Sequence, residues 1–391
     1  MNIFHCVESY YPAVGGMQEV VKQLSERLVK LGHTVTVLTR FNEERNFEEF
    51  KGVKIVSFNI IDNPKTVTTK EEQTYVDFLL NLNADIITFF AAQQWATDLA
   101  LPILKNIKAK KVSVPTGYSG LYKPEYKMYF EDMKTHIHNY DMNVYLSYDY
   151  RDINFAKENN VKNTIVITNG AAEDEFLGES KINVRHELSI PKDDFLILLV
   201  GSYTGIKGHK EAVELFLKSN LKNATLLMIG IKFEYFKRQY IKRPKLAWLY
   251  IMSKLFSSKR VIFKSLPRNT TVAAYKQANL FLFPSNVECS PIVLFECAAA
   301  KLPFLSSDAG NSIEIVQWTK GGEIMPTKKN KEGLCFVKIN DGVKMLNEMY
   351  ANEFKRKKMA ETSHEIWKQK YSWEVITKQY EKLYFNLINN K

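Results

Sequence analysis

Two carboxylates, Glu288 and Glu296, stand eight residues apart in the segment 284–316 (PSNVECSPIVLFECAAAKLPFLSSDAGNSIEIV) of this 391-residue chain. The apolar run between them and the small residues CAAA after the second predict a strand end, a loop and a helix packed on a sheet. Both acids are then expected at the carboxyl-end edge of the sheet, where open α/β sheets bind ligands. Each can accept two hydroxyl hydrogen bonds, and an acid on so apolar a helix needs a partner. Taken alone, the pair is explained at least as well as two acidic side chains with no functional role.

The residues around this pair resemble the nucleotide-sugar site of retaining glycosyltransferases of the GT-B fold, in particular glycosyltransferase family 4. The resemblance implies that Glu288 is catalytic and faces the hydroxyls of the donor sugar, and that Glu296 grips the ribose hydroxyls. The shared pattern is a Pro-Ser pair, a Glu-x7-Glu spacing, an Asp-x-Gly turn and a further Glu, carried by Pro284, Ser285, Glu288, Glu296, Asp308, Gly310 and Glu314.

The start of the expected helix also belongs to the donor site by this resemblance, through Pro291, Ile292 and Val293. Relatives have Gly-Phe-Gly after the first acid, whereas this chain has Cys289, Ser290 and Pro291. We therefore expect a sugar pocket of different shape.

Lys207 lies in the segment 194–216 (DFLILLVGSYTGIKGHKEAVELF), which predicts a buried strand, a loop and an amphipathic helix. A lone loop lysine is ordinarily solvated, but this segment resembles the family's Gly-Arg-Leu-x3-Lys-Gly motif. The resemblance makes Lys207 the catalytic lysine that meets the donor diphosphate, and it places Ser202 at the donor site where relatives carry arginine. Without that arginine the site lacks the several N–H groups of a guanidinium. We therefore expect either weaker binding of the sugar nucleotide or a basic residue that substitutes for the arginine. The candidate substitutes are His209, Lys210 and Arg268.

Gly15 and Gly16 stand at the first turn of a strand–turn–helix–strand pattern over residues 1–41. Two glycines by themselves fit a tight turn. At the start of a helix they can also bring backbone N–H groups and the helix dipole against phosphate. Their place matches the family's glycine loop, so the resemblance implies that they bind the donor diphosphate.

The segment VSVPTGYSGLYKPEY resembles a loop on which many relatives carry a histidine near the reacting sugar, and Thr116 stands at that position. We treat Thr116 as a candidate catalytic residue on the acceptor side. The missing histidine leaves open a weak or inactive sugar-nucleotide- or polysaccharide-binding protein, and the same fold also serves sugar-nucleotide epimerases.

The length of the chain and its alternating strands and helices predict an α/β protein with two doubly wound, Rossmann-like domains. The resemblance implies a GT-B fold, in which the domains face each other across a cleft and a last helix crosses back to the first domain. We expect a first domain of residues 1–175 with the last helix at 374–391, and a second domain of residues 176–373.

The composition and net charge of the chain indicate which classes of binding partner to expect. A formal net charge of +11 favours an anionic partner, and no nucleic-acid-binding motif accompanies it. No signal peptide is recognised, and the four cysteines lack ligand or disulfide spacing, so we expect a cytoplasmic protein. A basic insert around Trp248 fits either a helix pair with a solvated face or an anchor at the inner membrane surface.

The resemblance implies transfer of a sugar from a nucleoside diphosphate to a saccharide or lipid-linked acceptor in surface polysaccharide or glycolipid assembly. UDP and GDP donors both remain open. No metal is expected, because the chain lacks an Asp-x-Asp carboxylate pair and the diphosphate charge can be met by Lys207, the Gly16 backbone and helix dipoles.

Overall fold

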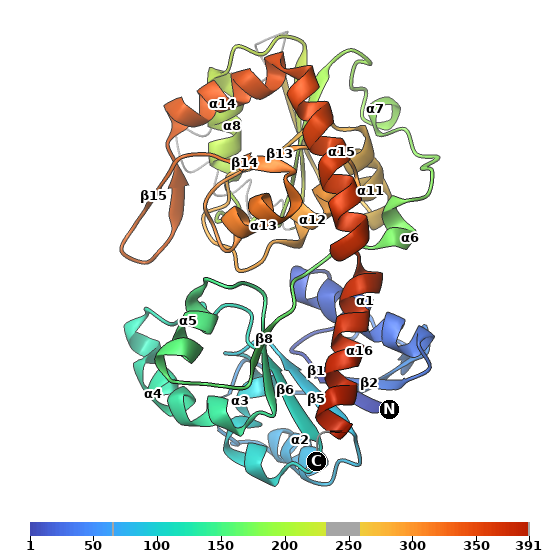
Figure 1. The fold of residues 1–391 in the computed structure, drawn as a ribbon. Coiled ribbons are helices and arrows are strands. Elements are labelled where there is room, and N and C mark those ends of the chain that lie inside the picture. Colours follow the sequence, from blue (N-terminus) through green and yellow to red (C-terminus); the bar gives the residue numbers. More distant parts are fainter. Residues whose placement is uncertain (65, 232–258, 390–391) are drawn as a thin grey trace. The chain divides into compact units, whose positions relative to one another are not determined.

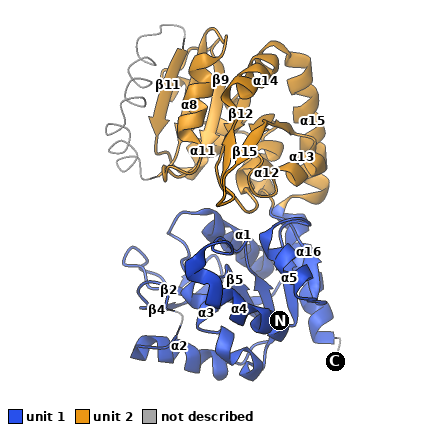
Figure 2. Ribbon diagram, turned by 90° about the vertical axis from the view of Figure 1, so that its left-hand side faces the viewer, with its two compact units in different colours: residues 1–169, 373–391 blue, residues 170–372 orange. Residues whose placement is uncertain are grey.

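The computed structural model describes residues 1–64, 66–231 and 259–389 of the chain. They form two compact units, residues 1–169 with 373–391 (unit 1) and residues 170–372 (unit 2), shown in blue and orange in Figure 2. The expected basic insert around Trp248 lies outside the described residues.

Unit 1 is built on an eight-stranded sheet of order β3-β4-β2-β1-β5-β6-β7-β8. Its neighbouring strands are parallel except for β3 and β4. The strands are β1 (Asn2–Cys6), β2 (Thr34–Arg40), β3 (Glu49–Phe50), β4 (Val53–Phe58), β5 (Ile86–Phe90), β6 (Lys110–Val114), β7 (Met142–Tyr145) and β8 (Thr164–Val166).

Helices connect these strands, as a parallel sheet requires (Figure 1). The helices of unit 1 are α1 (Gly16–Lys30), α2 (Lys70–Leu80), α3 (Trp95–Asp98), α4 (Lys127–His136), α5 (Arg151–Glu158) and α16 (Trp373–Asn389), with short 3₁₀ turns η1 (Leu101–Asn106), η2 (Pro124–Tyr126) and η3 (Ile137–Asn139). Helix α2 begins with a capping box in which Thr69 and Glu72 exchange side-chain and backbone hydrogen bonds.

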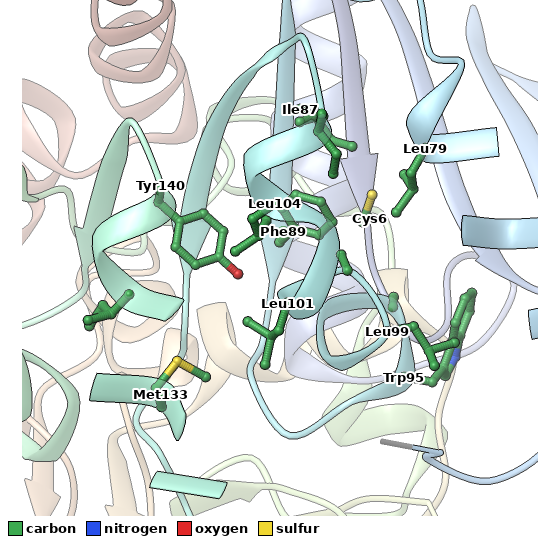
Figure 3. Close-up of a cluster of buried hydrophobic side chains, with 14 of the residues drawn as sticks. Cys6, Leu79, Ile87, Phe89, Trp95, Leu99, Leu101, Leu104, Met133 and Tyr140 are labelled. Atoms are coloured by element: carbon green, nitrogen blue, oxygen red, sulfur yellow. The ribbon is translucent and has the colours of Figure 1, made fainter. Parts of the chain in front are cut away.

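One apolar core cluster of unit 1 joins side chains of the sheet to those of α2 and of the segments that follow β5 (Figure 3). Ile87 and Phe89 point into it from β5, and Trp95 is fully buried at the start of α3. These two residues of β5 point the same way because successive side chains of a strand alternate between its faces.

Helix α16 belongs to unit 1 and is tied to it by buried polar contacts. The Tyr384 hydroxyl lies 2.8 Å from Thr88 Oγ1 and 3.5 Å from His5 Nε2. Burial lowers the pKa of His5 to about 3, so its ring is neutral and Nδ1 pairs with Ser25 Oγ at 2.8 Å. The buried Arg27 side chain places Nη2 2.7 Å from Glu374 Oε1. The last helix is therefore part of this unit's core.

Unit 2 contains a six-stranded parallel sheet of order β11-β10-β9-β12-β13-β14 and a separate antiparallel hairpin. The sheet strands are β9 (Phe195–Val200), β10 (Ala224–Ile229), β11 (Lys259–Lys264), β12 (Leu280–Phe283), β13 (Phe304–Ser306) and β14 (Gly322–Ile324), and the hairpin is β15 (Thr327–Lys329) with β16 (Cys335–Val337).

Both faces of this sheet are covered, which explains its continuous apolar runs. Leu196 and Leu198 of β9 point into one core cluster, whereas Ile197 and Leu199 point into the other. The described helices of unit 2 are α6 (Glu173–Phe176), α7 (Val184–Glu187), α8 (His209–Lys218), α11 (Arg268–Gln277), α12 (Ile292–Ala299), α13 (Ser312–Thr319), α14 (Ile339–Ala351) and α15 (Glu353–Lys370). The predicted fold, two doubly wound Rossmann-like α/β units, is confirmed.

Replacing Tyr384 by Phe is expected to lower the free energy of unfolding by about 1–3 kcal/mol, because it leaves the buried Thr88 hydroxyl without this partner. Urea or thermal unfolding measures the change. Tyr148→Phe is the control, since Tyr148 is 60% exposed. Equal stability of the two variants would contradict the conclusion that the Tyr384 hydroxyl helps to attach α16 to unit 1.

Candidate active site

The centre of unit 2 is the point where its strand order reverses. The chain runs outward from β9 through β10 to β11 and then returns to β12 on the other side of β9. The loops that leave the carboxyl ends of β9 and β12 therefore lie at this reversal of strand order, the usual ligand position in such sheets. Lys207 lies in the first loop and Glu288 in the second.

An ion pair joins these two loops. Lys207 Nζ donates to both oxygens of Glu288, at 2.7 and 2.8 Å, and Ser285 Oγ donates to Glu288 Oε1 at 2.7 Å. The Glu288 side chain is only 8% exposed, whereas that of Lys207 is 28% exposed. The carboxylate is thus held in place from two directions, and the lysine remains accessible from solvent.

Gly208 explains how the two loops come so close. It has φ = +68°, and a Cβ at this position would lie 2.0 Å from the Pro284 carbonyl oxygen. Only glycine fits such a position. The backbone N–H of Asn286 also donates to the Ile206 carbonyl at 2.9 Å. The loop contact that sets the lysine opposite the carboxylate is therefore a backbone contact.

Glu296 lies on α12 and has the partner that its apolar surroundings require. Arg268, the first residue of α11, places Nη2 2.6 Å from Glu296 Oε1 and 2.6 Å from Glu175 Oε2. The Glu296 side chain is 4% exposed and that of Arg268 is 39% exposed. The guanidinium bridges two acids, a geometry that suits arginine better than lysine.

The other two candidate bases differ from Arg268. His209 is buried, its Nε2 lies 3.2 Å from the Gly201 carbonyl oxygen, and burial lowers its pKa to about 4. It is therefore neutral at neutral pH and adds no charge to the loop. Lys210 is exposed on α8, and Ser202, at the family's arginine position, is half-buried.

The start of α12 is shaped by the Asp-x-Gly turn that the sequence singled out. Gly310 has φ = +62°, and a Cβ there would lie 2.3 Å from the Cys289 carbonyl oxygen, which also accepts the Asn311 N–H at 2.8 Å. This contact holds the segment before α12, where Pro291 is buried and Ile292 and Val293 are half-buried. Asp308 pairs with Lys329 of the hairpin at 2.8 Å.

Unit 1 reverses its strand order between β1 and β5, and the glycine loop follows β1. Gly15 is the extended residue before α1, where a Cβ would lie 2.2 Å from Gln18 Oε1, and Gly16 opens the helix facing free space. Arg45 braces this loop by donating to the Tyr11 and Tyr10 carbonyls at 2.9 and 3.2 Å. Sequence reasoning missed Arg45, because no local pattern marks a brace from a distant loop.

The loops after β5 and β6 contain residues in the left-handed region that side chains rarely adopt. Ala91 and Gln93 each have φ = +62°, Thr116 has +58° and Tyr118 has +46°. Gln93 joins the two loops, since its Oε1 accepts the Gly120 N–H at 3.0 Å while its Nε2 is buried without a partner. Such strain is common at functional sites. Gln93 had no sequence signal beyond its place after a strand.

The structure thus places Gly15, Gly16 and Thr116 in unit 1. It places the other predicted site residues, Ser202, Lys207, Glu288, Pro291, Ile292, Val293 and Glu296, in unit 2. Within unit 2, Lys207 and Glu288 come together directly, and Glu296 is paired separately with Arg268. Each set lies at the carboxyl-end edge of its own sheet.

Two family models match the chain. The model for glycosyl transferases group 1 matches residues 180–362, and the model for glycosyltransferase family 4 matches residues 14–173. The chain belongs to glycosyltransferase family 4. The predicted enzyme class, a glycosyltransferase, is confirmed.

This family 4 glycosyltransferase is 25% identical over 385 residues to an uncharacterized glycosyltransferase of Methanocaldococcus jannaschii, covering 94% of this chain and 93% of the relative. Its fold matches a sucrose-phosphate synthase of Thermosynechococcus elongatus with a TM-score of 0.79, 17% identity and full coverage of both chains. HepE of Anabaena, solved with UDP and glucose, matches with a TM-score of 0.74 and 14% identity over 99% of this chain and 100% of that one. The two Rossmann-like units are those of the GT-B fold.

In the described part of the glycosyltransferase, no group of three or more His, Cys, Asp or Glu side chains is arranged to hold a metal ion. Over the same residues, no helix combines the length and apolar character that crossing a bilayer demands.

Replacing Arg268 by Ala is expected to lower the free energy of unfolding by about 1–3 kcal/mol, because a nearly buried carboxylate loses its cation. Arg268→Lys restores only part of it, since one ammonium bridges two acids poorly. Arg260→Ala is the control: its side chain is 43% exposed and its acid lies 3.9 Å away. Urea unfolding that gives the same loss for both alanine variants contradicts the assignment.

Proposed function

We propose that this glycosyltransferase moves a sugar from a nucleoside diphosphate to an acceptor hydroxyl with retention of the anomeric configuration. The acceptor is a saccharide or lipid-linked saccharide in surface polysaccharide or glycolipid assembly. The observation that carries the proposal is the Lys207–Glu288 pair at the strand reversal of unit 2. It presents a cation and an oriented carboxylate at the position where such sheets bind ligands.

Lys207 meets the donor diphosphate in this proposal. Its ammonium pairs with Glu288, and a diphosphate offers a stronger anionic partner at the same place. The lysine then exchanges partners, and Glu288, still held by Ser285, becomes available to the sugar hydroxyls. The N-terminal backbone of α12, at Ile292 and Val293, adds N–H donors and a favourable dipole.

Glu296 binds the ribose hydroxyls. Arg268 holds Oε1 of this carboxylate, which fixes the side chain that accepts from the ribose hydroxyls. UDP-sugars are the first donors to test, because the similar HepE structure contains UDP and glucose. A cytoplasmic location is part of this proposal, since the four cysteines are not joined in disulfides.

Unit 1 supplies the acceptor side. Gly15 and Gly16 offer backbone N–H groups at the start of α1 to the diphosphate, and Thr116 stands near the reacting sugar in place of histidine. The charge that develops on the leaving diphosphate is met by Lys207 and helix dipoles, so the reaction needs no metal.

Transfer is tested by incubating the protein with UDP-sugars and candidate saccharide acceptors and by reading the anomeric configuration of the product by NMR. We expect retention, with the same rate in the presence of EDTA, because lysine and backbone groups carry the diphosphate charge. An inverted product overturns the mechanism, and a rate abolished by EDTA overturns the metal-free assignment.

Replacing Glu288 or Glu296 by alanine is expected to affect different steps of the reaction. Glu296→Ala weakens nucleotide binding by about 1.5–3 kcal/mol, because a charge-assisted hydrogen bond to ribose is lost. Glu288→Ala lowers turnover more than affinity, since sugar contacts act in the transition state. Calorimetry with free UDP together with kcat separates the roles. Equal loss of UDP affinity in both variants contradicts this division.

A further inference from the structure

The loop after β6 holds three successive residues with positive φ: Thr116 at +58°, Gly117 at +104° and Tyr118 at +46°. Glycine accepts this conformation at little cost, but threonine is branched at Cβ and adopts it rarely. Such a run persists only where the surrounding structure holds it in place.

Asp152 is the central contact. It lies in the first turn of α5, is 1% exposed, and its Oδ2 accepts the Gly117 N–H at 2.8 Å. Its Oδ1 accepts the Ile153 N–H at 3.0 Å, at the start of its own helix. One carboxylate therefore needs both oxygens as acceptors, one for the turn and one for the helix.

Aromatic packing supports the same turn. The Tyr118 ring is buried and meets Phe130 of α4 and Phe155 of α5 with ring centroids 5.1 and 5.5 Å apart. Helix α5 thus carries both the carboxylate and a ring that clamps the turn. Thr116, at the head of the turn, remains half-buried.

A buried carboxylate is a costly way to hold a loop. Tyr145 of β7 and Tyr118 of the turn face it, and the neighbouring Arg151 lies over the rings of Tyr122 and Tyr150 at 5.3 and 5.7 Å. Burial raises the pKa of Asp152 to about 6, although the Ile153 and Gly117 N–H groups act in the opposite direction. The group is therefore mostly ionised at neutral pH at a cost to stability.

We propose that Asp152 is a positioning residue for glycosyl transfer, which holds the Thr116–Gly117–Tyr118 turn so that Thr116 is presented to the reacting sugar. The inference rests on the proposed function of Thr116. It adds a residue that touches neither substrate and acts through the Gly117 N–H.

Protonation of Asp152 is expected to change activity and stability in different ways, which distinguishes a positioning role from a purely structural one. A proton on the carboxyl removes its negative charge and so weakens the hydrogen bond that it accepts from the Gly117 N–H, and transfer falls as pH drops through about 6. Stability responds in the opposite direction. Because the folded-state pKa is raised, the folded protein binds this proton more tightly, and the contribution of Asp152 to stability falls as pH rises.

The test compares Asp152→Asn with Asp149→Asn, the same chemical change three residues away at an exposed position. Asparagine keeps the shape of the side chain but can supply only one of the two acceptors. In Asp152→Asn we expect kcat to fall on the order of 10–100-fold, as for a misplaced reacting group. The fall of activity near pH 6 disappears, and UDP affinity and neutral-pH stability stay close to those of the unmodified protein. Asp149→Asn keeps the activity and pH profile of the unmodified protein.

Hydrogen exchange at the Gly117 amide gives a second measurement that needs no turnover. After correction for intrinsic exchange, the unmodified protein loses protection there below about pH 6, and Asp152→Asn lacks protection throughout. Unchanged protection, or an unchanged pH profile of kcat in Asp152→Asn, overturns the proposal. Failure of the unmodified protein to transfer any sugar counts instead against the proposed function, and the exchange measurement then decides the clamp alone.

Discussion

The backbone contact between the loops after β9 and β12 is the constraint on which the candidate site of unit 2 depends, because it sets Lys207 opposite Glu288. The two loops can meet because β9 and β12 are parallel neighbours in the sheet. A helix follows each loop, and the close approach of Gly208 to the Pro284 carbonyl brings the loops into contact. Side-chain geometry at the site is thus fixed by backbone packing, which tolerates little adjustment.

Unit 1 applies the same rule with different chemistry. Three of its costly features lie at the carboxyl ends of its strands: left-handed Thr116 after β6, left-handed Gln93 after β5 and the buried Asp152 that reaches the turn. None of them improves the packing of the sheet, whose core is apolar. A protein keeps strain and buried charge where their removal would cost function, so their location is itself informative.

The sequence predicted the fold well because its signals are periodic and local. The apolar run of β9 and the turn glycines can be recognised from the local sequence alone. An acid on the apolar helix α12 likewise indicates by itself that it needs a partner. What the sequence could not give was the identity of partners from distant loops. The sequence suggests Arg268 only as a substitute for the missing arginine at the diphosphate, whereas in the structure it pairs with Glu296. No local sequence pattern marks Arg45 as a residue that braces the glycine loop. Contacts of this kind depend on which strands become neighbours. The roles of these residues remain predictions.

The strength of the Lys207–Glu288 pair suits a site whose ligand is a charged diphosphate. A partly exposed ion pair contributes little to stability, about 0–1 kcal/mol, so exchanging it for another anion costs little. A fully buried pair would resist exchange, because separating its charges is expensive. Ser285 keeps Glu288 oriented when the lysine turns away, and the backbone contact at Gly208 keeps the loop in place. The site therefore combines exchangeable side chains with a fixed backbone, and such pre-organisation lowers the cost of binding.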